Sequence, residues 1–144
     1  MKKRRLGREL GLRVLYSWQM QGGTLASLTE GYFRTLPYLD DVLGFSRKLV
    51  FGVETHVNTL DKLIVKYSDN WKLERINPVE LNIMRVAVYE ILYETAIPPT
   101  VSINEAIEIA KKYGTGDSGK FVNAILDRIR KEAEKCEKKG NAGK

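Results

Sequence analysis

The sequence contains little of two residues on which much protein chemistry depends: it has one cysteine, Cys136, and one histidine, His56, in 144 residues. A single cysteine excludes a disulfide framework and a cysteine-based metal site, and it suits a reducing compartment, so we expect a cytoplasmic protein. His56 has no partner at the HxxxH or HxxE spacing of a metal motif. We expect no metal, no cofactor and no catalytic activity, because the sequence supplies neither a nucleophile with a base nor a metal cluster.

Long apolar runs and β-strand patterns are also missing. The basic residues 2–5 are followed by Arg8, Glu9 and Arg13, which interrupt the apolar run that a signal peptide needs. No segment alternates apolar and polar residues between hairpin turns. These absences predict an all-α protein with no secretion signal and no membrane span.

The chain has almost no net positive charge after residue 20. The net charge is +6, and residues 1–20 alone hold six basic residues and one acidic residue, a net +5. Such a cluster is typical either of a solvated chain end or of an arm that binds nucleic acid, and composition alone does not separate the two.

Helical periodicity covers most of the chain. It predicts an amphipathic helix over residues 5–21, with Arg8 and Arg13 on its polar face, and a shorter helix over residues 27–36. Residues 40–67 keep the helical period for their whole length, and because so long a span is unusual in a small domain, we expect a break near residues 55–58.

The clearest helix signals lie in residues 77–129, which predict three consecutive helices. The first has Asn77 as its N-cap, Pro78 at its first position and Glu80 in a capping box.

The second of these helices opens with Ser102 and Glu105 at capping-box spacing and ends at Gly114, and the third begins at Asp117 or Ser118. The whole is predicted to be a bundle of about seven helices.

Its single domain is predicted to span residues 1–135, with halves of about 1–70 and 71–135. A charged tail over residues 136–144 is expected to fray.

The start of the last helix has features that suit RNA. Unpaired N–H groups attract phosphate there, Gly119 allows close approach, and Lys120 adds a positive charge. Phe121 is either a ring on which an unpaired base stacks or the first core residue of its helix, and the pattern leaves both open. A nucleotide-hydrolysing phosphate loop is excluded, because GTGDSGK follows a helix and has Phe121 where Ser or Thr would hold magnesium.

Two segments carry a family resemblance: RRLGRELGLRVLYSWQMQ and IMRVAVYEILYETAIPPTVSINEAIEIAKKYGTGDSGKFVNAILD. They resemble the first helix and the C-terminal half of the NusB family of bacterial transcription antitermination factors, over about residues 3–131. The resemblance implies two packed three-helix bundles and a protein that binds the boxA RNA of nascent ribosomal RNA. It also implies two protein partners: NusE, which is a small-subunit ribosomal protein, and the antitermination complex of the transcribing RNA polymerase.

By matched position, the resemblance implies two surfaces. The RNA-binding residues would be Lys2, Lys3, Arg4, Arg5, Arg8, Asp117, Ser118, Gly119, Lys120 and Phe121. The NusE surface would include Tyr16 and Glu80, although a half-buried aromatic and a capping-box residue are equally ordinary roles for these two. The family often has alanine after its Arg pair, where this chain has Leu6-Gly7, and because Gly7 weakens the first turn, the sequence leaves open how far the arm is helical before RNA binds. The sequence also leaves open whether the free protein is a monomer or a weak homodimer.

Three alternatives remain at this point. One is a protein-interaction module that does not bind RNA. Another is the NusB-like domain that opens certain ribosomal RNA cytosine methyltransferases, disfavoured because the 144 residues contain no cofactor-binding strand. A helix-turn-helix DNA binder is disfavoured because the basic residues gather in an arm instead of on a recognition helix.

Overall fold

The computed structural model describes residues 2–38, 40–69 and 71–142, with side chains described from Lys3 to Lys135 within these ranges. The helices are α1 (Lys2–Gln21), α2 (Leu25–Arg34), α3 (Asp40–Tyr67), α4 (Pro78–Tyr93), α5 (Pro99–Tyr113) and α6 (Ser118–Ala142), with a short 3₁₀ turn, η1 (Leu73–Arg75), before α4. The described residues contain no strand, so the all-α prediction is confirmed, with six α-helices and one 3₁₀ turn in place of about seven helices. None of the described helices is long and apolar enough to cross a membrane.

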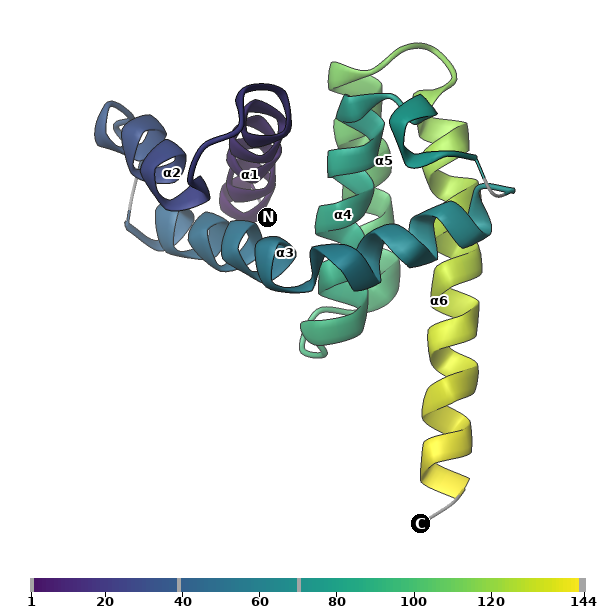
Figure 1. Cartoon of the computed structure of the whole chain (residues 1–144). Helices are drawn as coiled ribbons and strands as arrows, with labels where there is room; N and C mark the ends of the chain where they lie inside the picture. Colours follow the sequence, from purple (N-terminus) through teal and green to yellow (C-terminus); the bar gives the residue numbers. More distant parts are fainter. Residues whose placement is uncertain (1, 39, 70, 143–144) are drawn as a thin grey trace.

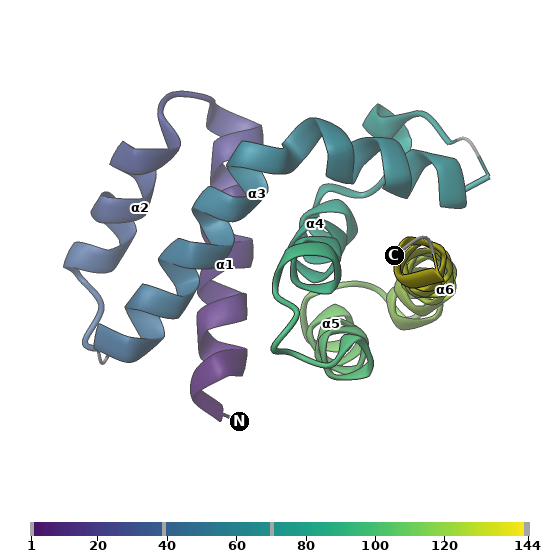
Figure 2. The ribbon, with the colours of Figure 1, turned by 90° about the horizontal axis from the view of Figure 1, so that it is seen from below.

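The helices form two groups that share α3. Figure 2 shows α1, α2 and the first part of α3 packed together, while α4, α5 and α6 gather on the other side and the second part of α3 passes over them. The helix α4 is central, because it contacts α1, α3, α5 and α6 and every residue from Leu81 to Ile91 is buried. A helix that is buried all round has no solvent face, and α4 accordingly holds much of the core.

The expected break near residues 55–58 is wrong, because α3 is one uninterrupted helix of 28 residues. It changes direction in its middle instead (Figure 2). Two features there favour a bend: Gly52 lies under the ring of Tyr89, where an added Cβ would come within 2.2 Å of the ring, and the Thr55 hydroxyl donates to the Phe51 carbonyl at 2.8 Å. Bending lets one helix pack against both groups.

The predicted N-cap of α4 is confirmed, whereas the predicted start of α5 is wrong. The Asn77 side chain accepts a hydrogen bond from the Val79 N–H at 2.8 Å, as expected of an N-cap. The helix α5 begins at Pro99, so Ser102 and Glu105 lie inside the helix, buried, and form no capping box. The predicted end at Gly114 and start at Ser118 are confirmed.

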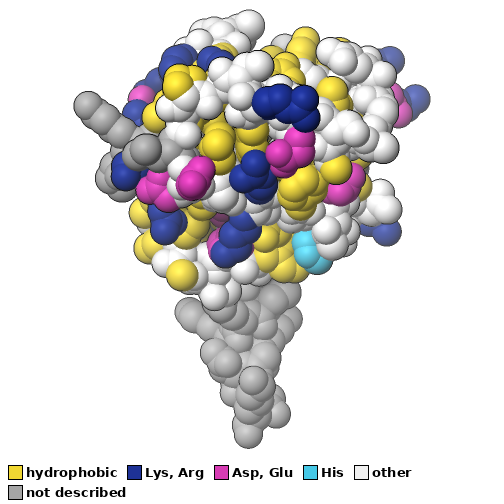
Figure 3. All heavy atoms as spheres, turned by 90° about the vertical axis from the view of Figure 1, so that its left-hand side faces the viewer, with side chains coloured by type: hydrophobic (Ala, Val, Ile, Leu, Met, Phe, Trp, Pro, Cys, Tyr) yellow, Lys and Arg dark blue, Asp and Glu magenta, His cyan; other side chains and the backbone are white. Residues whose placement is uncertain are grey.

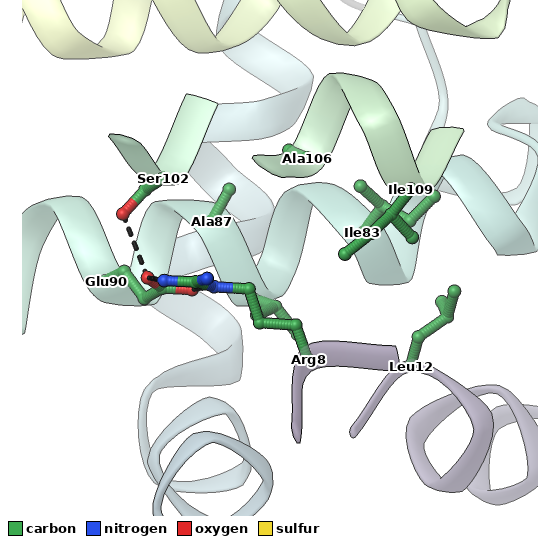
Figure 4. A pocket seen from close by; sticks show the side chains of 9 residues that line it. Arg8, Leu12, Ile83, Ala87, Glu90, Ser102, Ala106 and Ile109 are labelled. Atoms are coloured by element: carbon green, nitrogen blue, oxygen red, sulfur yellow. Dashed lines mark hydrogen bonds and ion pairs between the residues drawn. The ribbon is translucent and has the colours of Figure 1, made fainter. Parts of the chain in front are cut away.

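Ser102 and Glu105 instead belong to a buried ion cluster centred on Arg8, which the sequence placed on the polar face of the first helix. The Arg8 guanidinium donates to both carboxylate oxygens of Glu90, at 2.9 and 2.7 Å, and lies 3.5 Å from Glu105 Oε1. The Ser102 hydroxyl donates to Glu90 at 2.9 Å (Figure 4). Arg8 is only 4% exposed and Glu90 1%, so the cluster fixes α1 to α4 and α5 from the inside.

The predicted tail lies partly outside the described residues. The helix α6 runs on through Ala142, but residues 143–144 and the side chains beyond Lys135, Cys136 among them, are not described. The frayed tail over residues 136–144 therefore stays a prediction.

Replacing Arg8 with alanine should strongly destabilise the fold. The substitution leaves Glu90, and in part Glu105, as buried carboxylates without their partner, which typically costs about 3–5 kcal/mol. Urea unfolding at pH 7 measures the loss. Lys3→Ala is the control, because Lys3 and its partner Asp41 are both 61% exposed and the change should hardly alter the unfolding midpoint. Equal midpoints for the two variants would show that the buried cluster contributes nothing to stability.

Candidate functional site

The basic arm is the first turn of α1, and its side chains rest on neighbouring parts of the protein. Lys3 lies 3.2 Å from Asp41, and the Arg4 guanidinium sits 5.1 Å from the centre of the Phe45 ring. The hydrogen bond from Lys3 lowers the pKa of the Asp41 carboxyl. Gly7 does not interrupt the helix: an added Cβ there would lie 2.8 Å from the Phe45 ring, so the glycine allows α1 to pack closely on α3.

Arg5 links this surface to the buried cluster. Its Nε donates to Glu105 Oε2 at 3.1 Å, and the Arg5 side chain is 47% exposed whereas that of Glu105 is 6% exposed. This hydrogen bond raises the pKa of Arg5. Arg8 is one turn further along α1, inside the protein, and does not reach the surface with the rest of the arm. The side chain of Lys2 lies outside the described residues.

The start of α6 is held by its first residue. The Ser118 hydroxyl accepts from the Thr115 N–H at 2.9 Å and donates to Glu80 Oε1 at 2.7 Å. Ser118 is 1% exposed, so its hydroxyl works inside the protein, while Asp117 and Lys120 are exposed. The predicted capping box of Glu80 is therefore wrong, because its carboxylate holds the start of α6.

Gly119 faces α5. An added Cβ would meet Ile107 at 3.6 Å and Lys111 at 3.7 Å, which are ordinary contacts, so packing does not require a glycine at this position.

Phe121 shares features of both roles considered from sequence. It is half-buried and packs against the core, while its ring lies 6.3 Å from that of Trp71, with an angle of 51° between the ring planes. Trp71 is 53% exposed. No sequence pattern points to Trp71, because its neighbour Phe121 is fifty positions away and no periodicity connects them.

The two residues assigned to a protein partner lie beside a groove near this end of the bundle. Tyr16 is 39% exposed and lines the groove, and Val79, adjacent to Glu80, also lines it. The groove has a volume of about 300 Å³, and its other lining residues are Leu12, Arg13, Ser17, Tyr32 and Tyr113. The structure thus brings Tyr16, Glu80 and Ser118 to one region.

The arm lies elsewhere. In Figure 1 the N-terminus is at the lower end of α1, whereas α6 begins at the upper end of the bundle. The expected RNA-binding residues therefore form two separate groups. Sequence spacing cannot reveal this, because it gives the ends of each helix but not which way the helices run relative to one another.

Cations on α5 lie between the two groups. The helices α1 and α5 run in the same direction, as three contacts along them show. Arg5 meets Glu105, Glu9 lies 2.7 Å from Lys112, and Arg13 donates to Tyr113 at 3.1 Å. Lys112 is 62% exposed, and the adjacent Glu9 carboxylate raises the pKa of Lys112. Beyond it, α5 leads into the start of α6, where Lys111 lies beside Gly119.

Charge of both signs is spread over the face that α1 and α2 present. Figure 3 shows Lys and Arg side chains interspersed with Asp and Glu and with exposed apolar atoms on this side of the molecule. Among the side chains that the structure describes, this face therefore has no continuous basic patch. The residues with described side chains also contain no group of His, Cys, Asp and Glu that could hold a metal ion.

Comparisons with known proteins agree on one family. The model of the NusB family matches residues 5–131. The transcription antitermination protein NusB of Thermodesulfovibrio yellowstonii is 42% identical over 147 residues, covering 95% of this chain and 97% of that protein. The solved structure of T. maritima NusB has a TM-score of 0.81 at 39% identity, covering 90% of this chain and 91% of that one.

A structure of the antitermination factors NusB and NusE in complex with dsRNA is also similar. Its TM-score is 0.82 at 28% identity, and the match covers 92% of this chain and 98% of that chain.

Replacing Glu80 with alanine should loosen the start of α6. The Ser118 hydroxyl would lose its closest acceptor in the interior, at a cost of roughly 1–3 kcal/mol. Glu80→Gln is the matched control, because its amide oxygen can still accept from Ser118. Chemical denaturation should show a clear loss of unfolding free energy for Glu80→Ala and a smaller loss for Glu80→Gln. If both variants unfold at the wild-type midpoint, the hydrogen bond does not hold the helix start.

Proposed function

The chain belongs to the NusB family of transcription antitermination proteins, and on that premise we propose that it binds boxA-type single-stranded RNA of nascent ribosomal RNA together with NusE. In this role it acts by binding, without catalysis, as part of the RNA polymerase complex that passes terminators. The observation that carries the proposal is the similarity to a NusB chain solved with NusE and dsRNA.

The proposed RNA surface joins the arm to the start of α6. Lys3, Arg4 and Arg5 supply exposed positive charge at one end, and Lys120 supplies it at the other. Lys112 lies between them on α5, so phosphates can follow a row of cations along the molecule. We leave Arg8 out of this surface because its guanidinium is buried against Glu90.

RNA competes in this proposal with contacts inside the protein. Phosphate takes the place of Asp41 on Lys3, which costs little because that ion pair is exposed. Moving Arg5 from Glu105 to a phosphate costs more, because the Glu105 carboxylate is buried. Glu105 still keeps the nearby positive charge of Arg8. We therefore expect Lys3 and Arg4 to engage phosphate more readily than Arg5.

The proposed NusE surface centres on the groove beside Tyr16. An exposed tyrosine at the edge of an apolar groove is typical of the anchor residues of protein interfaces. Glu80 has a second task, since it also accepts the hydrogen bond from Ser118. A change of Glu80 is therefore expected to disturb the start of α6, and with it RNA binding, as well as the partner surface.

The first test replaces two arm cations without shortening the helix. Lys3→Gln with Arg4→Gln should weaken boxA RNA binding, and the plot of log affinity against log salt should flatten by roughly 0.7 for each phosphate that the variant no longer binds. The pair Lys48→Gln with Lys62→Gln removes the same charge from α3 and should leave the slope unchanged. Binding of labelled boxA and scrambled RNA is titrated at several salt concentrations. Equal slopes for the arm variant and the wild type would remove the arm from the RNA surface.

A second test addresses the partner. Tyr16→Ala should weaken NusE binding by about 2 kcal/mol or more if the ring is an interface anchor, with RNA binding by the isolated protein nearly unchanged. Tyr93→Ala is the matched control, because Tyr93 is 40% exposed, as Tyr16 is at 39%, but lies at the far end of α4. Calorimetric titration with NusE measures both, beside thermal melting. Similar NusE affinities for the two variants would rule out the groove as the partner surface.

A further inference from the structure

Trp71 is a large apolar side chain that the fold leaves in solvent. Its indole is 53% exposed, whereas most aromatic side chains of the protein lie against the core. Trp71 follows the turn after α3. In this turn the backbone N–H of Trp71 donates to the Ser68 carbonyl at 3.3 Å, and Asp69 has a left-handed backbone with φ of 58°. Packing in the core therefore does not explain why a tryptophan stands at position 71.

The turn before Trp71 contacts α6 through one arginine. Arg128 donates to the Tyr67 carbonyl at 3.0 Å and lies 3.6 Å from Asp69. Arg128 and Phe121 are seven residues apart on α6, which places them on the same face of the helix. The end of α3 and the start of α6 thus hold Trp71 and Phe121 in a fixed relation.

The two rings do not cover one another. Their centres are 6.3 Å apart and their planes are inclined by 51°, so the half-exposed indole keeps open surface next to the Phe121 ring. Each ring also has an exposed cation as its chain neighbour, Lys72 beside Trp71 and Lys120 beside Phe121. Aromatic rings interleaved with cations are what proteins use to hold unpaired bases and their phosphates.

We propose that Trp71 is a base-stacking residue, and that with Phe121 it forms the surface on which an unpaired base of single-stranded RNA lies. This inference rests on the proposed RNA-binding function and adds a contact from outside the arm and α6. The base stacks on the indole, and Lys72 and Lys120 hold the flanking phosphates. A protein partner covering the indole is the competing outcome, and the experiment separates the two.

The two tryptophans of the chain make the contact directly measurable. Trp18 lies on α1, where its indole N–H donates to the Gly23 carbonyl at 3.2 Å. The variant Trp18→Phe leaves Trp71 as the only indole, and Trp71→Phe leaves Trp18. Adding unlabelled boxA RNA should quench the emission of the first variant and leave that of the second nearly unchanged, while anisotropy of labelled RNA measures binding independently.

Affinity supplies the second measurement. Trp71→Ala should raise the Kd for single-stranded RNA about 5- to 150-fold, the range expected for one stacked base, with little change in thermal melting. Tyr93→Ala is the matched control, because Tyr93 is also an exposed aromatic residue, at 40%, and lies at the end of α4 away from Glu80 and Ser118. A duplex that pairs every base of the same RNA should quench Trp71 much less.

The outcomes separate the stacking role of Trp71 from the proposed function. If RNA binds but Trp71 emission and the Kd of Trp71→Ala stay at wild-type values, this inference fails and the proposed function stands. Quenching of Trp71 by NusE and not by RNA would assign the indole to a protein contact and also overturn it. If neither RNA form binds the wild-type protein, with or without NusE, both the inference and the proposed function fail.

Discussion

The buried charge of Arg8 is the constraint on which the rest of the structure depends. An arginine inside a protein must be matched by carboxylates that are buried with it, and here Glu90 comes from α4 and Glu105 from α5. The pairing therefore sets the positions of three helices at once. It also ties the arm to the core, because Arg5 shares Glu105 with Arg8. Other polar groups of α4 act in the same way, with Arg85 donating to Asp61 of α3 at 2.8 Å and Asn82 to Gln19 of α1 at 2.8 Å.

These polar contacts explain which predictions succeeded. Helix bounds such as Asn77 and Gly114 are local signals, and the backbone follows them at these two positions. Arg8, Ser102 and Glu105 were misplaced because a charged or hydroxyl residue looks the same in sequence whether it faces water or a buried partner. Their partners are 82 or more residues away from Arg8 or lie on another helix, so no local pattern contains the information.

The same limit applies to the candidate site. The sequence indicated the basic arm and the residues at the start of α6 as candidates, but not that they form two separate groups, nor that Lys112 and Trp71 lie beside them. The hydrogen bond between Ser118 and Glu80 is a further case. It joins one residue assigned to RNA and one assigned to a partner, so the two proposed surfaces share a structural element.

The separation of the arm from the start of α6 also has a consequence for the size of a ligand. Arg5 meets Glu105 in the middle of α5, and from Glu105 to Tyr113 the helix rises about 12 Å at 1.5 Å per residue before the chain turns into α6. A free phosphate cannot contact both groups at once, whereas an extended polymer can. In the proposed RNA surface, the packed helices therefore favour a long ligand over a short one before any base is read.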